Sequence, residues 1–174
     1  SMVRKLPRQR NPPGTRYLTP EGHQGLRAEF HKLLYVDRPA MVEQVADAAA
    51  MGDRSENAEY IYGKKKLRQI DSRLRFLEQR LSDAVVVNPA EQSFNDIRFG
   101  ATVVLEDEDT EEELTYTLVG EDEIDPHRQR ISWRSPVGQA LIGKQEDDLI
   151  VVQTPKGRRE LVVLRFSYCG QSHA

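Results

Sequence analysis

Two carboxylates three residues apart, Asp53 and Glu56, are the side chains of this sequence best suited to chemistry. They lie in the polar stretch 52–60, which separates two long segments with helical patterns. At a helix N-terminus, residues at this spacing can face the same way, and exposed carboxylates bind a hard divalent cation such as Mg²⁺. Two ligands alone hold such an ion weakly. The alternative is that both acids only cap a helix and complement its dipole.

The first segment has clear signals for the start and end of a helix. Thr19 is suited to the N-cap, Pro20 to the first helical position and Glu21 to the positive end of the helix dipole. Gly52 is suited to ending the helix, because glycine tolerates a positive φ angle. Between these points Pro39 removes one backbone donor, so we expect a kink or a brief interruption there.

The second segment predicts a helix with a heptad seam. Asp53 or Ser55 can cap its first N–H groups. Apolar or small residues then follow in alternating steps of three and four, at Tyr60, Gly63, Leu67, Ile70, Leu74, Leu77 and Leu81. One helix cannot bury this seam alone, so the two segments should form a long antiparallel coiled-coil hairpin. Arms of about 30 residues are about 45 Å long.

Basic residues lie between the seam positions of the second helix, at Lys64, Lys65, Lys66, Arg68, Arg73, Arg75 and Arg80. They make one flank of the predicted hairpin basic, which is suited to nucleic acid but also occurs on solvated coiled coils. The net charge is +4 up to Gln92 and −7 from Ser93 onward. This asymmetry indicates two modules, the first facing a polyanion.

The expected domains are a flexible basic extension over 1–16, a coiled-coil hairpin over 17–90 and a small α+β domain over 93–170. The extension is rich in proline and arginine, and it either contacts nucleic acid loosely or is only solvated. In the last domain, period-two patterns predict an antiparallel sheet with one short helix over 135–143. The predicted strands are Ala101–Leu105, Leu114–Val119, Arg130–Trp133, Leu149–Thr154 and Leu161–Tyr168.

Several classes of function are disfavoured by composition and spacing. One cysteine, Cys169, permits no internal disulfide and no thiolate metal site, which fits a reducing cytosol and a cytoplasmic protein. The four histidines lack metal-binding spacing, and no phosphate-binding loop or nucleophile elbow is present. No apolar run is long enough to cross a membrane, so we expect no membrane partner.

The stretch Gly-Asp-Arg-Ser-Glu-Asn-Ala-Glu-Tyr at 52–60, followed by Lys64–Asp71, resembles the tip and second helix of the bacterial Gre transcript cleavage factors, GreB more than GreA. The opening Tyr17–Gly22 also fits this family. Later segments resemble its second domain: Ser135-Pro136, Ala140–Lys144, Glu146–Asp148 and Thr154–Gly157. The resemblance covers about 17–168 in the right order. Arg134 departs from it, since GreB-like sequences tend to carry an acid there.

The resemblance implies a fold and a set of partners. The fold is an α-helical coiled-coil hairpin that enters the secondary channel of bacterial RNA polymerase, followed by an FKBP-like α+β domain that docks on the channel rim. The implied activity is to stimulate endonucleolytic cleavage of backtracked nascent RNA by the polymerase, with no hydrolase activity of the chain alone. We expect a monomer.

The resemblance also implies roles for individual residues. Asp53 and Glu56 would support the second Mg²⁺ of the polymerase, an ion shared with the enzyme and not held by the chain alone. Arg54, Ser55 and Asn57 would support the tip. The basic flank from Lys64 to Arg75 would guide the RNA, and Arg134, Ser135 and Pro136 would contribute to docking.

Two rival functions stay open at this point. One is a channel-binding regulator or inhibitor of RNA polymerase with the same fold, which a tip lacking the two acids would mark. The other is a structural or nucleic-acid-binding coiled coil with an FKBP-like appendage.

Overall fold

The computed structural model describes residues 15–52 and 57–168, and these divide into two compact units. One unit comprises residues 23–83, and the other comprises 15–22 together with 84–168. These limits differ from the predicted boundaries because a short strand near the N-terminus, β1 (Arg16–Leu18), pairs in parallel with β2 (Ala84–Val86). Most of the predicted basic extension lies outside the described residues.

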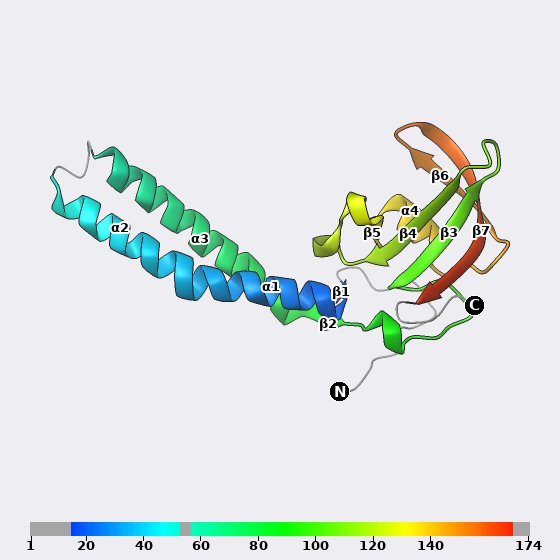
Figure 1. Cartoon of the computed structure of the whole chain (residues 1–174), viewed down its shortest axis with the longest axis horizontal. Helices are drawn as coiled ribbons and strands as arrows, with labels where there is room; N and C mark the ends of the chain where they lie inside the picture. The colour runs from blue at the N-terminus through cyan, green and yellow to red at the C-terminus, as the bar shows by residue number, and fades with distance from the viewer. Residues whose placement is uncertain (1–14, 53–56, 169–174) are drawn as a thin grey trace. The chain divides into compact units, whose positions relative to one another are not determined.

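The helical unit is a hairpin whose first arm contains α1 (Pro20–Lys32), the π-helical turn η1 (Leu33–Asp37) and α2 (Arg38–Ala50). The second arm is α3 (Ala58–Asp83), which packs beside α2 (Figure 1). The predicted interruption near Pro39 takes the form of η1, in which the Arg38 N–H donates to the Leu33 carbonyl. Pro39 has no N–H for the Tyr35 carbonyl and its ring would crowd that group, so a wider turn relieves both problems.

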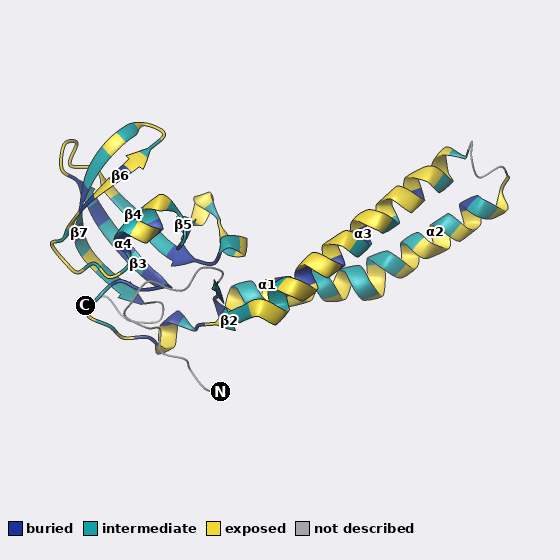
Figure 2. Cartoon of the chain, turned by 180° about the vertical axis from the view of Figure 1, so that it is seen from behind, coloured by how far each residue is buried: buried dark blue, intermediate teal, exposed yellow. Residues whose placement is uncertain are grey.

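The predicted heptad seam of α3 is confirmed by burial. All seven of its positions are buried or half-buried, whereas nearly every other position of α3 is exposed (Figure 2). Gly63 is one of the buried positions, and a Cβ atom built there would lie 2.7 Å from Val45 Cγ2. The glycine therefore permits a close approach between α2 and α3.

The second unit contains a five-stranded sheet with strand order β5-β4-β3-β7-β6. The strands are β3 (Ala101–Asp107), β4 (Glu113–Val119), β5 (Arg130–Ser132), β6 (Leu149–Thr154) and β7 (Gly157–Tyr168). All five predicted strands are present, although the expectation of a purely antiparallel sheet is wrong at one edge. There β5 runs parallel to β4, because the chain crosses over through the 3-10 turns η3 (Glu121–Glu123) and η4 (Pro126–Arg128).

One helix and several loops close the core of this unit. Helix α4 (Pro136–Leu141) is the predicted short helix, and the 3-10 turn η2 (Pro89–Glu91) precedes the sheet. Tyr17, Phe99 and Trp133 pack together, with ring centroids 5.3 to 6.5 Å apart. The aromatic residue of β1 is thus part of the same core as the sheet. Among the helices described, none is both long and apolar enough to span a bilayer.

Candidate functional site

The tip of the hairpin lies between the end of α2 and the start of α3. The predicted site residues Asp53, Arg54, Ser55 and Glu56 fall in this interval and lie outside the described residues. On the α2 side the helix ends at Ala50, and Gly52 has a φ angle of +146°, as predicted for the residue that ends it. On the α3 side the first described residue is Asn57.

Asn57 joins the two ends of the tip. Its side-chain oxygen accepts a hydrogen bond from the Tyr60 N–H at 3.1 Å, which is the contact of a helix N-cap. Its amide nitrogen donates to the Ala48 carbonyl oxygen at 2.6 Å. The prediction that Asp53 or Ser55 caps this helix is therefore wrong, because α3 begins at Ala58, directly after Asn57.

The basic flank follows the tip along α3. Lys64, Lys65, Lys66 and Arg68 are all exposed. They are consecutive or nearly so on the half of α3 nearest the tip, so their charges can act on a polyanion that reaches the tip.

Arg73, further along the flank, has contacts within the hairpin. Its guanidinium makes two hydrogen bonds to the Glu29 carboxylate, at 2.7 and 3.0 Å. It also lies 4.8 Å from the centroid of the Phe76 ring, and Arg80 lies 4.7 Å from the same ring. The role of Arg73 therefore includes linking α1 to α3, beyond the RNA contact predicted for it.

A second ion pair joins the two arms near η1. Arg38 Nε lies 2.7 Å from an Asp71 carboxylate oxygen. The hydrogen bond from Arg38 lowers the pKa of the Asp71 carboxyl group. The pair ties the residue after the π-helical turn to α3.

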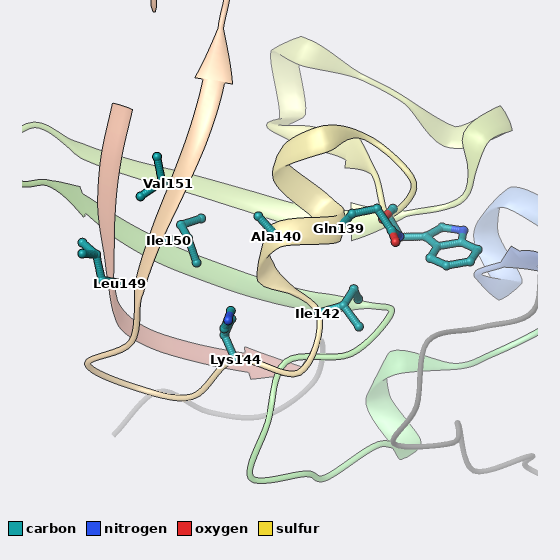
Figure 3. Close-up of a pocket in the computed structure, with 8 residues that line it drawn as sticks. Gln139, Ala140, Ile142, Lys144, Leu149, Ile150 and Val151 are labelled. Atoms are coloured by element: carbon teal, nitrogen blue, oxygen red, sulfur yellow. The ribbon is translucent and has the colours of Figure 1, made fainter. Parts of the chain in front are cut away.

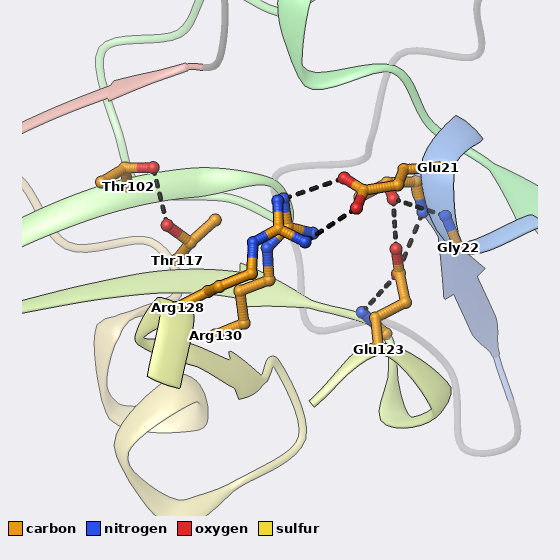
Figure 4. Close-up of polar contacts among 9 residues, drawn as sticks. Glu21, Gly22, Thr102, Thr117, Glu123, Arg128 and Arg130 are labelled. Atoms are coloured by element: carbon orange, nitrogen blue, oxygen red, sulfur yellow. Dashed lines mark hydrogen bonds and ion pairs between the residues drawn. The ribbon is translucent and has the colours of Figure 1, made fainter. Parts of the chain in front are cut away.

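The start of α1 is held by contacts within the second unit (Figure 4). Thr19 is the N-cap that the sequence predicted, since its hydroxyl accepts the Gly22 N–H at 3.1 Å. The Thr19 hydroxyl in turn donates to the carboxylate of Glu123, which also accepts the N–H groups of Thr19 and Gly120.

Glu21 completes this group. Its two carboxylate oxygens accept hydrogen bonds from Arg128 at 2.8 Å and from Arg130 at 3.0 Å (Figure 4). The hydrogen bond from Arg128 is the main cause of a lowered pKa at Glu21. Glu21 was predicted to interact with the helix dipole, and it also forms ion pairs with Arg128 of η4 and Arg130 of β5.

The predicted docking residues are located at the start of α4. Ser135 caps this helix by accepting the Gly138 N–H, and Pro136 is its first residue. Arg134 donates to the Thr15 carbonyl at 2.6 Å, and its Nε lies 2.9 Å from Glu121. Its guanidinium also lies 4.8 Å from the centroid of the Trp133 ring. Arg134 therefore stabilises the fold of this unit, independently of any contact it makes with a partner.

An open groove of about 300 Å³ lies beside α4 (Figure 3). It is lined by Trp133, Gln139, Ala140, Ile142, Lys144, Leu149, Ile150 and Val151. Leu149 and Val151 are on β6, an edge strand, and both side chains are about half exposed. The groove therefore adds apolar surface next to the predicted docking residues.

Sequence reasoning missed two features of the hairpin. The Ala48 carbonyl gives no signal in the sequence as a partner of Asn57. The second feature is the exposure of Tyr35 and Val36 on η1. It did have a signal in the sequence, because both residues fall outside the apolar spacing of the first arm. Within residues 15–52 and 57–168, His, Cys, Asp and Glu side chains form no group of three that could hold a metal ion.

Comparison with known proteins gives a consistent result for both units. Residues 16–86 match the family described as "Transcription elongation factor, N-terminal", and residues 91–168 match "Transcription elongation factor, GreA/GreB, C-term". The chain is 50% identical over 155 residues to transcription elongation factor GreB of Pseudomonas aeruginosa, covering 89% of this chain and 92% of that protein. It is 51% identical over 152 residues to GreB of Yersinia pestis, covering 87% and 88%.

Among solved structures, the chain is similar to the GreA factor homolog 1 protein of Thermus thermophilus. The two are 28% identical with a TM-score of 0.40, and the match covers 86% of this chain and 97% of that one.

Proposed function

The chain belongs to the GreA/GreB family of transcription elongation factors, and from this premise we propose that it stimulates cleavage of backtracked nascent RNA by bacterial RNA polymerase. The chain supplies the tip of the helical hairpin, and the polymerase supplies the active site. The chain alone has no hydrolase activity under this proposal, and its place of action is the cytoplasm, where the polymerase works.

The observation that carries the proposal is the position of Asp53 and Glu56 between two helix ends that Asn57 ties together. Because Asn57 takes the N-cap position of α3, neither acid is needed at that position. Under this proposal their carboxylates serve a metal site shared with the polymerase.

The chemistry of the donor set fits Mg²⁺, which takes oxygen ligands and keeps several waters. Asp53 and Glu56 would hold the ion together with carboxylates of the polymerase, because two ligands from the chain leave its coordination incomplete. When bound, such an ion activates water or stabilises the leaving oxygen in phosphoryl transfer. Arg54 and Ser55 would orient the water or a phosphate, and Asn57 would keep the tip closed.

The exposed basic flank supports the part of the proposal that concerns RNA. Lys64, Lys65, Lys66 and Arg68 follow the tip directly along α3, so they can attract the RNA segment that a backtracked polymerase extrudes. Arg75 would extend the flank. Arg134, Ser135 and Pro136, beside the apolar groove at α4, would form the contact with the channel rim.

A cleavage assay on a stalled, backtracked elongation complex tests the proposal. Wild-type protein should raise the rate of internal RNA cleavage, and the double variant Asp53→Ala, Glu56→Ala should return it to the rate of polymerase alone while still binding the enzyme. Glu59→Ala is the matched control, because Glu59 is an exposed acid beyond the cap of α3 and should leave stimulation unchanged. The proposal fails if the double variant stimulates cleavage at the wild-type rate.

The same assay separates the rival functions. A channel-binding inhibitor would slow both elongation and cleavage, and removing the two acids would not relieve the effect. A structural or nucleic-acid-binding coiled coil would not retain RNA polymerase in a pull-down. Adding the chain to free RNA with Mg²⁺ should release no fragments.

A further inference from the structure

An aromatic and basic groove lies mainly on the first arm of the hairpin, separate from the tip, and Leu81 of α3 completes its lining. We call it the π-turn groove, and its lining includes Arg27, Phe30, His31, Lys32, Tyr35 and Val36. It is open and has a volume of about 580 Å³. Apart from Leu81, these residues belong to α1 or η1.

The π-helical turn explains why apolar side chains are exposed there. Leu33 and Leu34 are half-buried, but the next two residues, Tyr35 and Val36, are 63% and 57% exposed. The wide turn adds a residue to the helix and so moves side chains of the turn itself out of the seam. Such turns are often found at functional positions, and this one presents a tyrosine and a valine side by side to solvent.

Tyr35 already makes one ring contact within the hairpin. The His31 ring lies beside it, with centroids 4.6 Å apart and planes tilted by 49°. This contact holds the tyrosine in one orientation, while most of its side chain still faces solvent. A flat ring fixed in this way is a platform on which another flat group can stack.

The charged side chains that line the groove are all basic. Arg27 and Lys32 line the groove and are exposed, and no carboxylate is among its lining residues. Lys32 forms a loose ion pair with Asp37, at 3.6 Å on the neighbouring turn, and keeps 71% of its side chain exposed. Aromatic platforms inside a positive groove are the pattern by which proteins bind single-stranded nucleic acid without sequence preference.

We propose that the π-turn groove binds single-stranded RNA, with a base stacked on Tyr35 and the adjoining phosphates next to Arg27 and Lys32. This inference rests on the proposed function, because the RNA in question is the segment extruded from a backtracked polymerase. An apolar or acidic peptide fits less well, since the apolar surface is only a few side chains wide and the cations surround a flat ring.

The position of the groove predicts which transcripts would reach it. Tyr35 lies 17 residues before Gly52 at the tip. Along a helix this corresponds to about 25 Å, at about 1.5 Å per residue. A stacked strand rises about 3.4 Å per nucleotide, so about seven extruded nucleotides span the distance. Short extruded segments would meet only the tip and the flank of α3, whereas longer ones would also reach Tyr35.

The test compares elongation complexes backtracked by about two and about twelve nucleotides, on either side of the expected span. Tyr35→Ala should raise the protein concentration needed for half-maximal cleavage about fivefold or more on the deeply backtracked complex, which corresponds to the loss of one stacked base. It should leave the shallow complex unchanged. Tyr35→Phe should restore the wild-type value on both complexes. Val42→Ala, an exposed apolar change on α2, is the control and should have no effect on either.

A crosslinking measurement identifies the occupant directly. With 4-thiouridine placed at about the seventh extruded nucleotide, wild-type protein should crosslink through the peptide that contains Arg27 to Val36. A photoreactive residue at position 35 should crosslink to RNA. Crosslinks from position 35 only to a polymerase subunit would mean that a protein surface occupies the groove and would overturn the inference, as would an equal effect of Tyr35→Ala on both complexes.

These outcomes are distinguishable from a failure of the proposed function. If wild-type protein does not stimulate cleavage even in the shallow complex, the proposed function fails. If it stimulates both complexes and Tyr35→Ala behaves as wild type, only the π-turn groove inference fails.

Discussion

The side-chain amide of Asn57 donates a hydrogen bond to the carbonyl oxygen of Ala48, with the two atoms 2.6 Å apart. The bond joins the last turns of α2 to the start of α3 and closes the interval that contains Asp53 and Glu56. The same side chain accepts the Tyr60 N–H and so caps α3. One residue therefore fixes both the end of the hairpin and the beginning of its second helix.

We expect the two contacts of Asn57 to be separable by substitution. Asn57→Ser keeps an N-cap acceptor but is too short to reach Ala48, whereas Asn57→Ala loses both contacts. The alanine variant should be less stable than the serine variant by about 1 kcal/mol in urea unfolding, which is the usual value of a cap. Both variants should stimulate RNA cleavage less than wild type. A serine variant that stimulates cleavage to the wild-type rate would show that the bond to Ala48 does not position the acids.

Two glycines in helices should respond in opposite ways to alanine. Gly63→Ala places a Cβ atom 2.7 Å from the stiff side chain of Val45, and overpacking of this kind costs about 1–3 kcal/mol. Gly25 is the matched control on α1, since no atom of the described residues lies within 4 Å of its added Cβ. Gly25→Ala should therefore stabilise the protein by about 0.5–1 kcal/mol through helix propensity. Thermal unfolding of the two variants would test the contrast, and an equal gain in both would contradict it.

Asp107 should make the stability of the folded protein depend on pH in the acidic range. The Arg159 guanidinium, 2.8 Å away, and the N–H groups of Thr110 and Asp109 lower the pKa of the Asp107 carboxyl group. A carboxyl group whose pKa is lowered on folding stabilises the folded state at pH values above its unfolded pKa of about 3.9. This contribution is lost as the pH falls through the pKa of the folded state.

Asp107→Asn should therefore be less stable than wild type near neutral pH, and the difference should shrink below about pH 4. Denaturant unfolding at several pH values would measure it, with the exposed Glu108→Gln as control. A difference that stays constant across this range would contradict the explanation.

Tyr168 should make the stability of the folded protein depend on pH in the alkaline range. Burial raises the pKa of its hydroxyl to about 12, and the hydroxyl donates to the Asp96 carbonyl oxygen at 2.9 Å. Because the folded pKa is the higher one, the stabilisation is complete below the ordinary value of about 10 and is lost as the pH rises toward about 12.

Absorbance titration of the tyrosines should therefore show its last component near pH 12, later than that of Tyr17, whose pKa is also raised by burial. Tyr168→Phe should remove that component and leave the earlier ones unchanged. A titration of Tyr168→Phe that retains the late component would assign it to another tyrosine.

Much of the fold could be predicted because its determinants are close together in the chain. The cap of α1 joins Thr19 to Gly22, three residues away, and the seam of α3 is a repeat within one helix. Strand β6 was predicted with its observed bounds because alternation and turn residues define it locally. The spacing of the two acids singled them out as caps or ligands, and the family resemblance favoured the ligand role, which stays a prediction. The family itself was confirmed by the matching family models.

The remaining features depend on contacts between distant residues. Strand β1 has three residues and too little pattern to be recognised before it pairs with β2. Glu123 caps the N–H of Thr19 across 104 positions, and Arg134 binds the Thr15 carbonyl across 119. The direction of β5 follows from a crossover that no single segment encodes.

The sequence by itself determined the two helices of the hairpin and the seam of α3, because helix periodicity and capping act within a few residues. It also located the two acids and the basic residues of α3, whose roles stay predictions. Only the tertiary structure decided that the Asn57 side chain also donates across the tip to the Ala48 carbonyl, and that the interruption near Pro39 is a π-helical turn that exposes Tyr35. The physical reason is that hydrogen bonds and packing between segments depend on which surfaces meet after folding, and local propensity carries no record of that choice.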